Sequence, residues 1–442
     1  MNNTLLTSFI AFLLLANFQV LAQEKLSLEQ VIELALENNY QIKIARNNAA
    51  IESNNAHVGN AGMLPSLDLS GNWNNSVNNI QQQFLSGDEN TNPSAKSAQF
   101  GGVAEMNWTL FDGLKMFTTY KQLKSFEAKG ALEARLEVEN TIQDVISLYY
   151  EIIRIKENIR STEEIIALSK ERMDLAELRL EAGSSSKVEY LQARVDWNAD
   201  RSALIELNEI LSIAQSNLNT LLSRSVDTEI LPVHDTISLN AALEYGPLKM
   251  ALEAENTNLK VQDTEREIAL YQLKNFKRQR SPVLNFRGGY DYAQQSSDAG
   301  FLTTSQSFGP YYGLNASVNL FNGLQLNQQI KNARITVENS QLMRENLELE
   351  LNSELWKAYK NYSSSREIAE LEQENIQSAA ENLELAYETY KNGLISGIDF
   401  RNVQSNLLEA RNRYINSRYR AKLAETVLLR LSGKLLEESA AP

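Results

Sequence analysis

The stretch WTLFDGL, Trp108 to Leu114, returns later in the chain as VNLFNGL, Val318 to Leu324. The phenylalanines of the two stretches, Phe111 and Phe321, are 210 positions apart (321 minus 111). Gly183 and Gly393 have the same separation, and each interrupts a long helical pattern. Two landmarks that keep one spacing indicate that the segment between them is duplicated.

The segments that lead into these two glycines are free of proline. Each of them, from Gly113 to Gly183 and from Gly323 to Gly393, therefore predicts one helix of about 70 residues, on the order of 100 Å long. Near the turns, the apolar positions recur in steps of three and four, which is the period of a coiled coil. The seam comprises Ile166, Ser169, Met173, Ala176 and Leu180 in the first copy, and Ile376, Ala379, Leu383, Ala386 and Tyr390 in the second.

Each long helix is followed by a predicted returning helix, at about 187–222 and 397–431, so that the chain forms two helical hairpins. The first turn holds Ser184 and Lys187 at the spacing of an acyl-serine nucleophile. The second copy has Leu394 and Gly397 at these positions. The pattern therefore favours turns at Gly183, Gly393 and Gly397 over a catalytic site, and a serine acylase is the least favoured of three hypotheses.

Between the helical blocks, the hydrophobic period changes to two. The alternation predicts four strands at about 65–77, 99–111, 282–294 and 310–321, each of roughly ten residues with one apolar face. This length is typical of outer-membrane barrel strands, although a water-soluble sheet with one buried face alternates in the same way. Aromatic residues on the apolar faces favour the membrane, because such residues gather at membrane interfaces: Trp73, Trp108, Tyr290 and Tyr312.

Four strands are too few to close a barrel, since single-chain barrels begin at about eight strands. An open edge in lipid would leave backbone groups unpaired. A membrane sheet would therefore have to be shared between chains, with eight strands from two copies or twelve from three. A wide pore favours three or more copies.

Composition excludes several classes of function. The 442-residue chain has no cysteine, so it has no disulfide and no thiolate metal site or nucleophile. Its histidines, His57 and His234, are too far apart in sequence to indicate a metal or catalytic site, and we expect no cofactor. A net charge of −14 argues against nucleic acid as a partner.

The N-terminus predicts the destination of the chain. Residues 1–22 have the short apolar run and the small residues before a cleavage site that are typical of a secretory signal peptide. Beyond them, no apolar run is long enough for a transmembrane helix. The basic run KNFKRQR, Lys274 to Arg280, is interpreted as a solvated helix face, on a helix about ten residues longer than its counterpart in the first copy.

As an ordered set, these motifs resemble the TolC-like outer-membrane efflux channel family. The resemblance rests on LSLEQVIELALENNYQIKIARNNAAIE from Leu26, LPSLDLSG from Leu64, the LFDG stretch, the glycine turn before KVEYLQA and the second round of the same pattern. It implies a trimer with a twelve-stranded barrel in the outer membrane and a helical tunnel in the periplasm. It also implies a passive conduit, not an enzyme, that works with a periplasmic adaptor and an inner-membrane pump of the RND or ABC type, in drug efflux or type I protein secretion.

The predicted organisation follows from the duplication. After the signal peptide come a first repeat at 23–223, a linker at 224–238, a second repeat at 239–432 and a tail at 433–442. The alternative function is a soluble periplasmic scaffold or adhesin that binds a partner through its hairpins.

The resemblance also assigns roles at the hairpin tips. It implies an acidic pore ring at Asp399, with Glu189 as the equivalent in the first hairpin, and a closed-state contact through Tyr390. The chain departs from the family pattern at two positions, because a second aspartate of the constriction falls on Asn402 and an arginine of the gate falls on Ile395. The gate is therefore expected to be weaker or locked differently. An ordinary acidic residue at a helix N-terminus is the alternative for Asp399.

Overall fold

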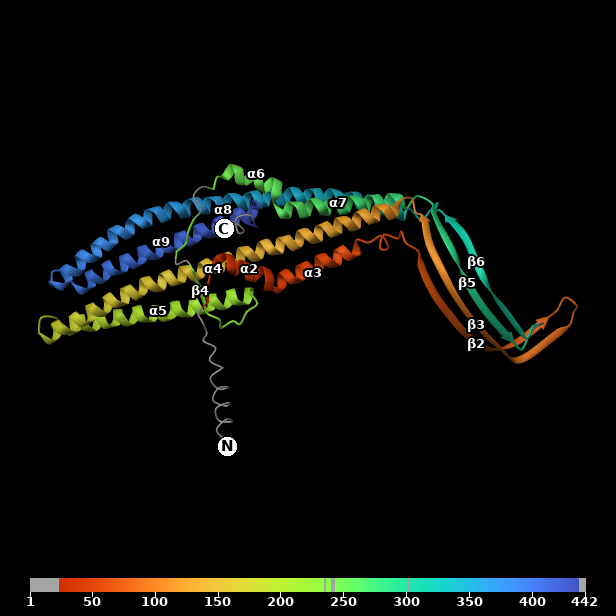
Figure 1. Cartoon of the computed structure of the whole chain (residues 1–442), viewed down its shortest axis with the longest axis horizontal. Helices are drawn as coiled ribbons and strands as arrows, with labels where there is room; N and C mark the ends of the chain where they lie inside the picture. The colour runs from red at the N-terminus through yellow and green to blue at the C-terminus, as the bar shows by residue number, and fades with distance from the viewer. Residues whose placement is uncertain (1–23, 234–235, 240–242, 300–301, 437–442) are drawn as a thin grey trace, which may run out of the picture. The chain divides into compact units, whose positions relative to one another are not determined.

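The computed structural model describes residues 24–233, 236–239, 243–299 and 302–436, so the predicted signal peptide lies outside the described residues. The elements follow the chain as an alternation of helical and strand blocks (Figure 1). They are β1 (Glu24–Leu26), α2 (Leu28–Asn38), α3 (Tyr40–Asn55), β2 (Ser66–Gln83), β3 (Glu89–Phe111), α4 (Lys115–Glu181), α5 (Lys187–Leu221), β4 (Ile230–Pro232), α6 (Tyr245–Glu255), α7 (Thr257–Arg278), β5 (Val283–Ser297), β6 (Thr304–Ser317), α8 (Gln325–Lys391) and α9 (Gly397–Leu431).

The duplication is confirmed by the helices. α4 and α8 each have 67 residues, and α5 and α9 each have 35. Corresponding helices begin 210 residues apart, at Lys115 and Gln325 and at Lys187 and Gly397. Each 67-residue helix is about 100 Å long at 1.5 Å per residue. The predicted pair of long helical hairpins is therefore present.

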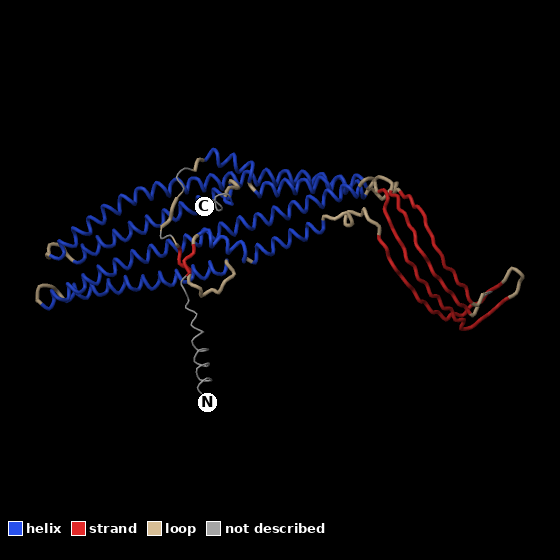
Figure 2. Tube along the Cα trace, viewed as in Figure 1, coloured by secondary structure: helices blue, strands red, loops and turns tan. Residues whose placement is uncertain are grey.

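The chain forms two compact units, each of which draws on both copies of the repeat. The helical unit comprises residues up to Arg46, 134–259 and 347 onward. The sheet unit comprises 47–133 and 260–346. Figure 2 shows the helices in blue and the strands in red.

Three buried clusters lie in the helical unit, one of them around Tyr390 and Phe400 near the hairpin tips. The other two involve the shorter elements. One unites α2, α4 and α5 with the short parallel pair β1 and β4, and the Tyr149 hydroxyl donates to the Leu26 carbonyl there at 3.1 Å. The other unites α6, the helical-unit part of α8 and α9 around Leu252 and Leu355, which are completely buried. The segment 224–238, predicted as a linker, thus contributes β4 to the first cluster.

Both copies break their first helix in the same way. Asn39 and Asn256 separate α2 from α3 and α6 from α7, and each side-chain oxygen accepts two backbone N–H groups at the start of the next helix. Their amide groups donate to the carbonyls of Leu221 and Leu431, at 2.8 and 2.9 Å. One asparagine per copy therefore caps a helix and ties it to the end of a hairpin.

The sheet unit contains a four-stranded antiparallel sheet in the order β2-β3-β5-β6. Its register aligns the predicted faces, because apolar Leu67 and Met106 are paired, and so are polar Asn285 and Asn315. β2 and β3 are longer than predicted, with 18 and 23 residues. β6 was expected to reach residue 321, but it ends at Ser317. Ser317 pairs with Val283, the first residue of β5, so later residues have no partner in that strand.

The polar face of the sheet carries a cross-strand cluster. Glu105 on β3 accepts hydrogen bonds from Arg287 on β5 and from the Tyr311 hydroxyl on β6, each at 2.5 Å. Gly289 lies between Glu105 and Tyr311 in the register. A Cβ atom at Gly289 would come within 3.0 Å of the Tyr311 hydroxyl, so the missing side chain lets the tyrosine cross the strand.

The expectation about the helix before Pro282 was wrong in size. α7 has 22 residues and its counterpart α3 has 16, a difference of six residues instead of about ten. Where α7 continues as helix, the first copy has a bent turn from 56 to 64. None of the described helices combines the length and apolarity that crossing a membrane requires.

Candidate gate at the tips of the helical hairpins

The two hairpin turns have the same local structure. Gly183 and Gly393 follow α4 and α8 with φ of +72° and +73°, the left-handed conformation that glycine adopts without steric cost. Ser186 and Ser396 then cap α5 and α9, and their hydroxyls accept the backbone N–H of Glu189 and Asp399 at 3.3 and 3.2 Å. The predicted gate acids are therefore the third residues of their helices, one on each tip.

The predicted turn residue Gly397 has a different role in the structure. It is the first residue of α9, without a positive φ. A Cβ atom here would lie 3.3 Å from Glu189 Oε1 and 3.7 Å from the Tyr390 ring. Gly397 therefore permits the close approach of the two hairpins.

Tyr390 is completely buried between the hairpins. Its ring stacks on Phe400 with the centroids 5.1 Å apart, and its hydroxyl donates to Glu189 Oε1 at 3.3 Å. Burial raises the pKa of Tyr390, and the negative charge of Glu189 raises this pKa further. The other oxygen of Glu189 accepts from the Ser185 hydroxyl at 2.6 Å. Two of the predicted gate residues are thus in direct contact, across the boundary between the hairpins.

Asp399 stands apart from this contact. Its carboxylate is exposed and accepts a hydrogen bond from the Ser396 hydroxyl at 2.7 Å. The position suits a negative charge, because the helix macrodipole is positive at its N-terminus. The geometry of one chain is therefore compatible both with an ordinary acidic residue in the first turn of a helix and with an acidic ring made by several copies.

Two arginines of the first hairpin donate hydrogen bonds to backbone carbonyls of the second. The Arg179 guanidinium donates to the carbonyls of Tyr390 and Lys391 at 2.6 and 3.1 Å, and lies 4.9 Å from the centre of the Tyr390 ring. Arg172 is almost completely buried; it donates to the Gly397 carbonyl at 3.2 Å and pairs with Asp196. These contacts add donors to the carbonyls at the end of α8 and join α4 to the start of α9.

A third arginine joins the hairpins farther from the tip. Arg401 on α9 donates to both carboxylate oxygens of Asp200 on α5, at 2.7 and 2.6 Å, and the Ser169 hydroxyl on α4 donates to the same carboxylate at 2.6 Å. Burial would lower the pKa of Arg401, but the Asp200 carboxylate outweighs this effect and the pKa is raised. The Arg401 guanidinium therefore stays charged, and the contacts at Asp200 link three helices.

The structure offers no support for catalysis at the first tip. The Ser184 hydroxyl donates to the Arg179 carbonyl at 3.1 Å as part of the helix end. Within the described part of the chain, no group of three or more His, Asp or Glu residues could hold a metal ion.

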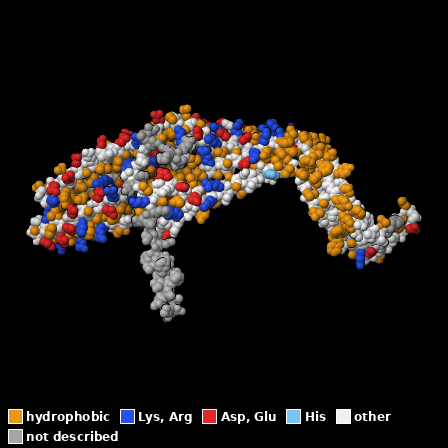
Figure 3. Space-filling model, in the orientation of Figure 1, with side chains coloured by type: hydrophobic (Ala, Val, Ile, Leu, Met, Phe, Trp, Pro, Cys, Tyr) orange, Lys and Arg blue, Asp and Glu red, His pale blue; other side chains and the backbone are white. Residues whose placement is uncertain are grey.

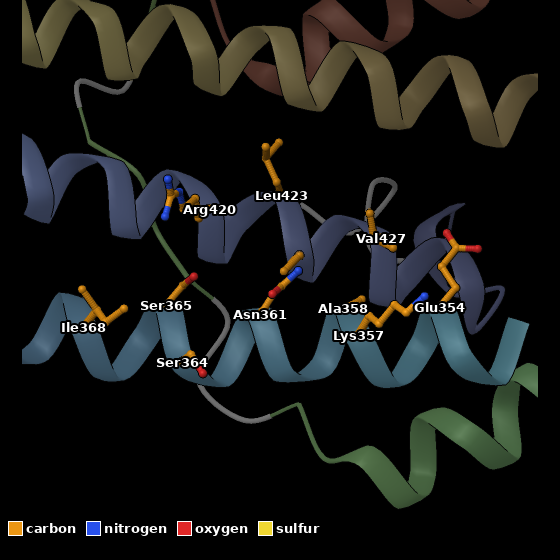
Figure 4. A pocket seen from close by; sticks show the side chains of 11 residues that line it. Glu354, Lys357, Ala358, Asn361, Ser364, Ser365, Ile368, Arg420, Leu423 and Val427 are labelled. Atoms are coloured by element: carbon orange, nitrogen blue, oxygen red, sulfur yellow. The ribbon is translucent and has the colours of Figure 1, made fainter. Parts of the chain in front are cut away.

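A groove of about 650 Å³ lies between α8 and α9, lined by small side chains such as Ala358, Ser365 and Ala424, with Lys357 and Arg420 beside them (Figure 4).

Comparison with known families decides the identity of this architecture. A family model described as "Outer membrane efflux protein" matches residues 31–224 and 249–434, most of the chain. The chain belongs to the outer membrane efflux protein family. The suspected relationship to outer-membrane efflux channels is thereby confirmed. A search of curated protein sequences finds no match.

Solved structures of outer-membrane channels share the fold of this efflux protein. The CmeC outer membrane channel of Campylobacter jejuni is 17% identical, with a TM-score of 0.77 over 93% of this chain and 89% of that one. The outer membrane protein VceC of Vibrio cholerae is 16% identical, with a TM-score of 0.72 over 92% and 96%. The open state of the MtrE channel of Neisseria gonorrhoeae is 15% identical, with a TM-score of 0.70 over 92% and 89%.

Three arginines that join the hairpins, Arg172, Arg179 and Arg401, were not predicted from the sequence. The family pattern places a gate arginine at Ile395 on the second hairpin, whereas Arg172 and Arg179 belong to the first. A signal was present in the duplication, since the positions 210 residues away from the three arginines hold neutral residues. These are Asn382, Thr389 and Leu191, opposite Arg172, Arg179 and Arg401 respectively.

Proposed function

We propose that this outer-membrane efflux protein is a passive conduit built from three chains. The observation that carries the proposal is a four-stranded sheet whose outer strands, β2 and β6, have no further partner in the described chain. In lipid, such edges must be paired, and a neighbouring copy can supply the partner. Three copies give a closed barrel of about twelve strands, wide enough for a lumen.

The helical hairpins form the periplasmic part of this conduit. Their length of about 100 Å suits a tunnel that carries substrate through the periplasm to the barrel. The proposal places the gate at the tips, where Tyr390 and Glu189 join the hairpins and Asp399 faces the mouth. Three copies of each acidic residue around an axis would attract cations to the mouth.

The partners follow from the role of a conduit. The proposed assembly includes a periplasmic adaptor and an inner-membrane pump of the RND or ABC type, which supplies the energy for efflux of small molecules or secretion of proteins. The chain itself transports and does not catalyse. The family membership and the shared fold with outer-membrane channels support this role.

Planar bilayer recording tests the proposal. The full chain, extracted from outer membranes in detergent and added to a lipid bilayer, is expected to give discrete conductance steps. A protein that stays in the periplasmic fraction and never conducts would contradict the channel and favour the soluble scaffold.

A further inference from the structure

A basic group lies where α7 approaches the sheet. Lys274, Lys277 and Arg280 are exposed and lie nine, six and three residues before Val283, the first residue of β5. At 1.5 Å per helical residue, Lys274 lies about 6 Å from the end of α7 at Arg278, and residues 279–282 connect that end to β5. Arg278, in contrast, is engaged within the protein, with the Leu114 carbonyl and the Thr118 hydroxyl.

The neighbouring helix extends this group. α7 packs on α8 through Leu273, Ile330 and Ala333, and Arg280 donates to the Asn327 side chain at 2.7 Å. Lys331 and Arg334 follow Asn327 by four and seven residues, so all three lie on one face of α8. Both cations are exposed. The five side chains Lys274, Lys277, Arg280, Lys331 and Arg334 are called the junction cations below.

Carboxylates of the two helices leave most of this charge uncompensated. Asp263 on α7 pairs with Arg344, and Glu267 accepts hydrogen bonds from Ser125 and Tyr271. Glu338, one turn beyond Arg334, is the exposed carboxylate nearest to the group along α8. The helix dipole explains cations only in the last turn of α7, since Lys331 and Arg334 lie in the first third of α8.

Exposed apolar side chains adjoin the junction cations. The segment between β6 and α8 exposes Leu320 and Phe321 to 92% and 77%, and Leu324 is also exposed. In Figure 3, a group of Lys and Arg side chains lies beside the hydrophobic surface where helices meet strands. Large apolar side chains this exposed mark a contact with lipid or with protein, and in the proposed channel they lie beside the headgroup layer.

In the proposed channel, the junction cations lie on the periplasmic side of the membrane strands. The polar layer on each side of a bilayer is about 5–8 Å thick, and Lys and Arg side chains reach along apolar surfaces toward it. Their long side chains can therefore extend toward the lipid phosphates. The first copy has no lysine or arginine from Asn47 to Ala95, so the duplicated fold does not require the three cations at the end of α7. The two cations of α8 do have counterparts, since Lys121 and Lys124 lie 210 residues before Lys331 and Arg334.

We propose that the junction cations bind the phosphate headgroups of anionic phospholipid in the periplasmic leaflet and hold the channel at a fixed depth. This inference rests on the proposed membrane channel. The guanidinium of Arg280 suits a phosphate because it can donate two parallel hydrogen bonds, whereas lysines act as point charges. Each cation near the surface strengthens binding about fivefold.

The test compares two lipids on the delipidated full chain in neutral detergent. Native mass spectrometry counts bound phosphatidylglycerol and phosphatidylcholine over a concentration series. The wild-type protein is expected to retain phosphatidylglycerol preferentially. The variant Lys274→Gln, Lys277→Gln, Arg280→Gln is expected to bind it on the order of a hundredfold more weakly. Equal retention of both lipids by the wild-type protein would overturn the proposal.

A matched control removes the same charge elsewhere. Lys249→Gln, Lys357→Gln, Lys360→Gln changes three cations of the helical unit and is expected to leave phosphatidylglycerol binding within about twofold of wild type. An equal loss in this control would reduce the effect to net charge and overturn the site. Competition by inorganic phosphate as effective as that by lipid would assign a free-anion site instead and would also overturn it.

Two further measurements keep the proposal testable if the triple variant fails to fold. Phosphatidylglycerol retention by the wild-type protein is expected to fall between low salt and about 0.5 M NaCl, and insensitivity to salt would contradict a phosphate contact. Light scattering in phosphatidylcholine distinguishes a failure of the lipid site from a failure of the proposed channel. A triple variant that falls apart into single chains would assign the cations to a contact between copies, whereas a wild-type protein that is a soluble monomer would refute the channel itself.

Discussion

Arg401 on the second hairpin donates a hydrogen bond to each carboxylate oxygen of Asp200 on the first, at 2.7 and 2.6 Å. The pair is largely enclosed, with Asp200 only 7% exposed. Together with Arg172 and Arg179 nearer the tip, it places the charged links between the hairpins inside one chain. Ile395, where the family pattern has an arginine, carries no charge, and the hairpins are joined by cations at other positions, which include Arg172, Arg179, Arg401 and Arg411.

The first prediction concerns this pair. Asp200→Ala is expected to lower the free energy of unfolding by about 2–3 kcal/mol, because it leaves the Arg401 charge and the Ser169 hydroxyl without their acceptor. The midpoint of thermal unfolding, followed by circular dichroism in detergent, measures the loss. Asp200→Leu combined with Arg401→Met is expected to recover much of it.

A surface pair provides the control for Asp200. Lys249 and Glu253 form an ion pair at 3.9 Å with both side chains 47% exposed. Glu253→Ala is therefore expected to change the stability by less than about 0.5 kcal/mol. If Asp200→Ala proves as mild as Glu253→Ala, the buried link does not hold the hairpins together.

The second prediction concerns the turn glycines. Gly183→Ala and Gly393→Ala are each expected to cost about 1 kcal/mol, because alanine adopts a positive φ with strain. Space is not the cause, since an added Cβ atom would meet nothing within 4 Å at either position. Gly246, in helix α6, also has free space but no positive φ. Gly246→Ala should therefore be neutral or stabilising in the same thermal measurement, and equal losses at all three glycines would refute the turn argument.

The sequence was sufficient to predict the helices because their signals are long and repeated. Proline-free segments and the constant spacing of 210 residues place α4, α5, α8 and α9 almost to the residue. The alternation also assigned each strand its faces, since a period of two survives any choice of strand end. Strand ends were harder to predict, as at Ser317, because they depend on where a partner strand begins.

Comparing the copies marks the arginines that only one copy has, but it does not predict which groups these arginines contact. Arg179 and Arg401 occur in one copy only, and their acceptors come from the opposite hairpin. Tertiary packing decides which arginine reaches which carbonyl, and no local pattern encodes it.

The third prediction concerns Asp399. Asp399→Ala is expected to reduce cation selectivity and block by divalent cations, because it removes a negative charge that each copy contributes to the mouth. Reversal potentials under a salt gradient in planar bilayers measure this change. Glu388→Ala, which removes an exposed acidic residue of α8 before the turn, provides the comparison. Unchanged selectivity in Asp399→Ala would leave this residue as an ordinary acidic residue in the first turn of α9.

The fourth prediction concerns pH. The Tyr387 hydroxyl donates to Glu171 Oε2 at 2.5 Å, and this bond, followed by burial, raises the pKa of Tyr387 from 10.0 to about 12. The folded protein thus holds the phenol proton more tightly than the unfolded chain does. The contact therefore contributes its full stability below about pH 10 and loses it as the pH rises through about 12.

Phenolate absorbance measures this titration. The difference between the wild-type protein and Tyr387→Phe is expected to have a midpoint near 12. Glu171→Gln should move this midpoint toward the ordinary value of tyrosine, about 10. A midpoint already at about 10 in the wild-type protein would show that the contact between Tyr387 and Glu171 does not form in solution.

The mass of the detergent-extracted species tests the shared barrel most directly. Outer membranes are fractionated, and the extracted protein is weighed by light scattering with correction for bound detergent. We expect a membrane-derived species of about three times the chain mass, because four strands per chain require three copies to close a wide barrel. A soluble periplasmic monomer, in which no second copy pairs with the edges of the sheet, would contradict the shared barrel.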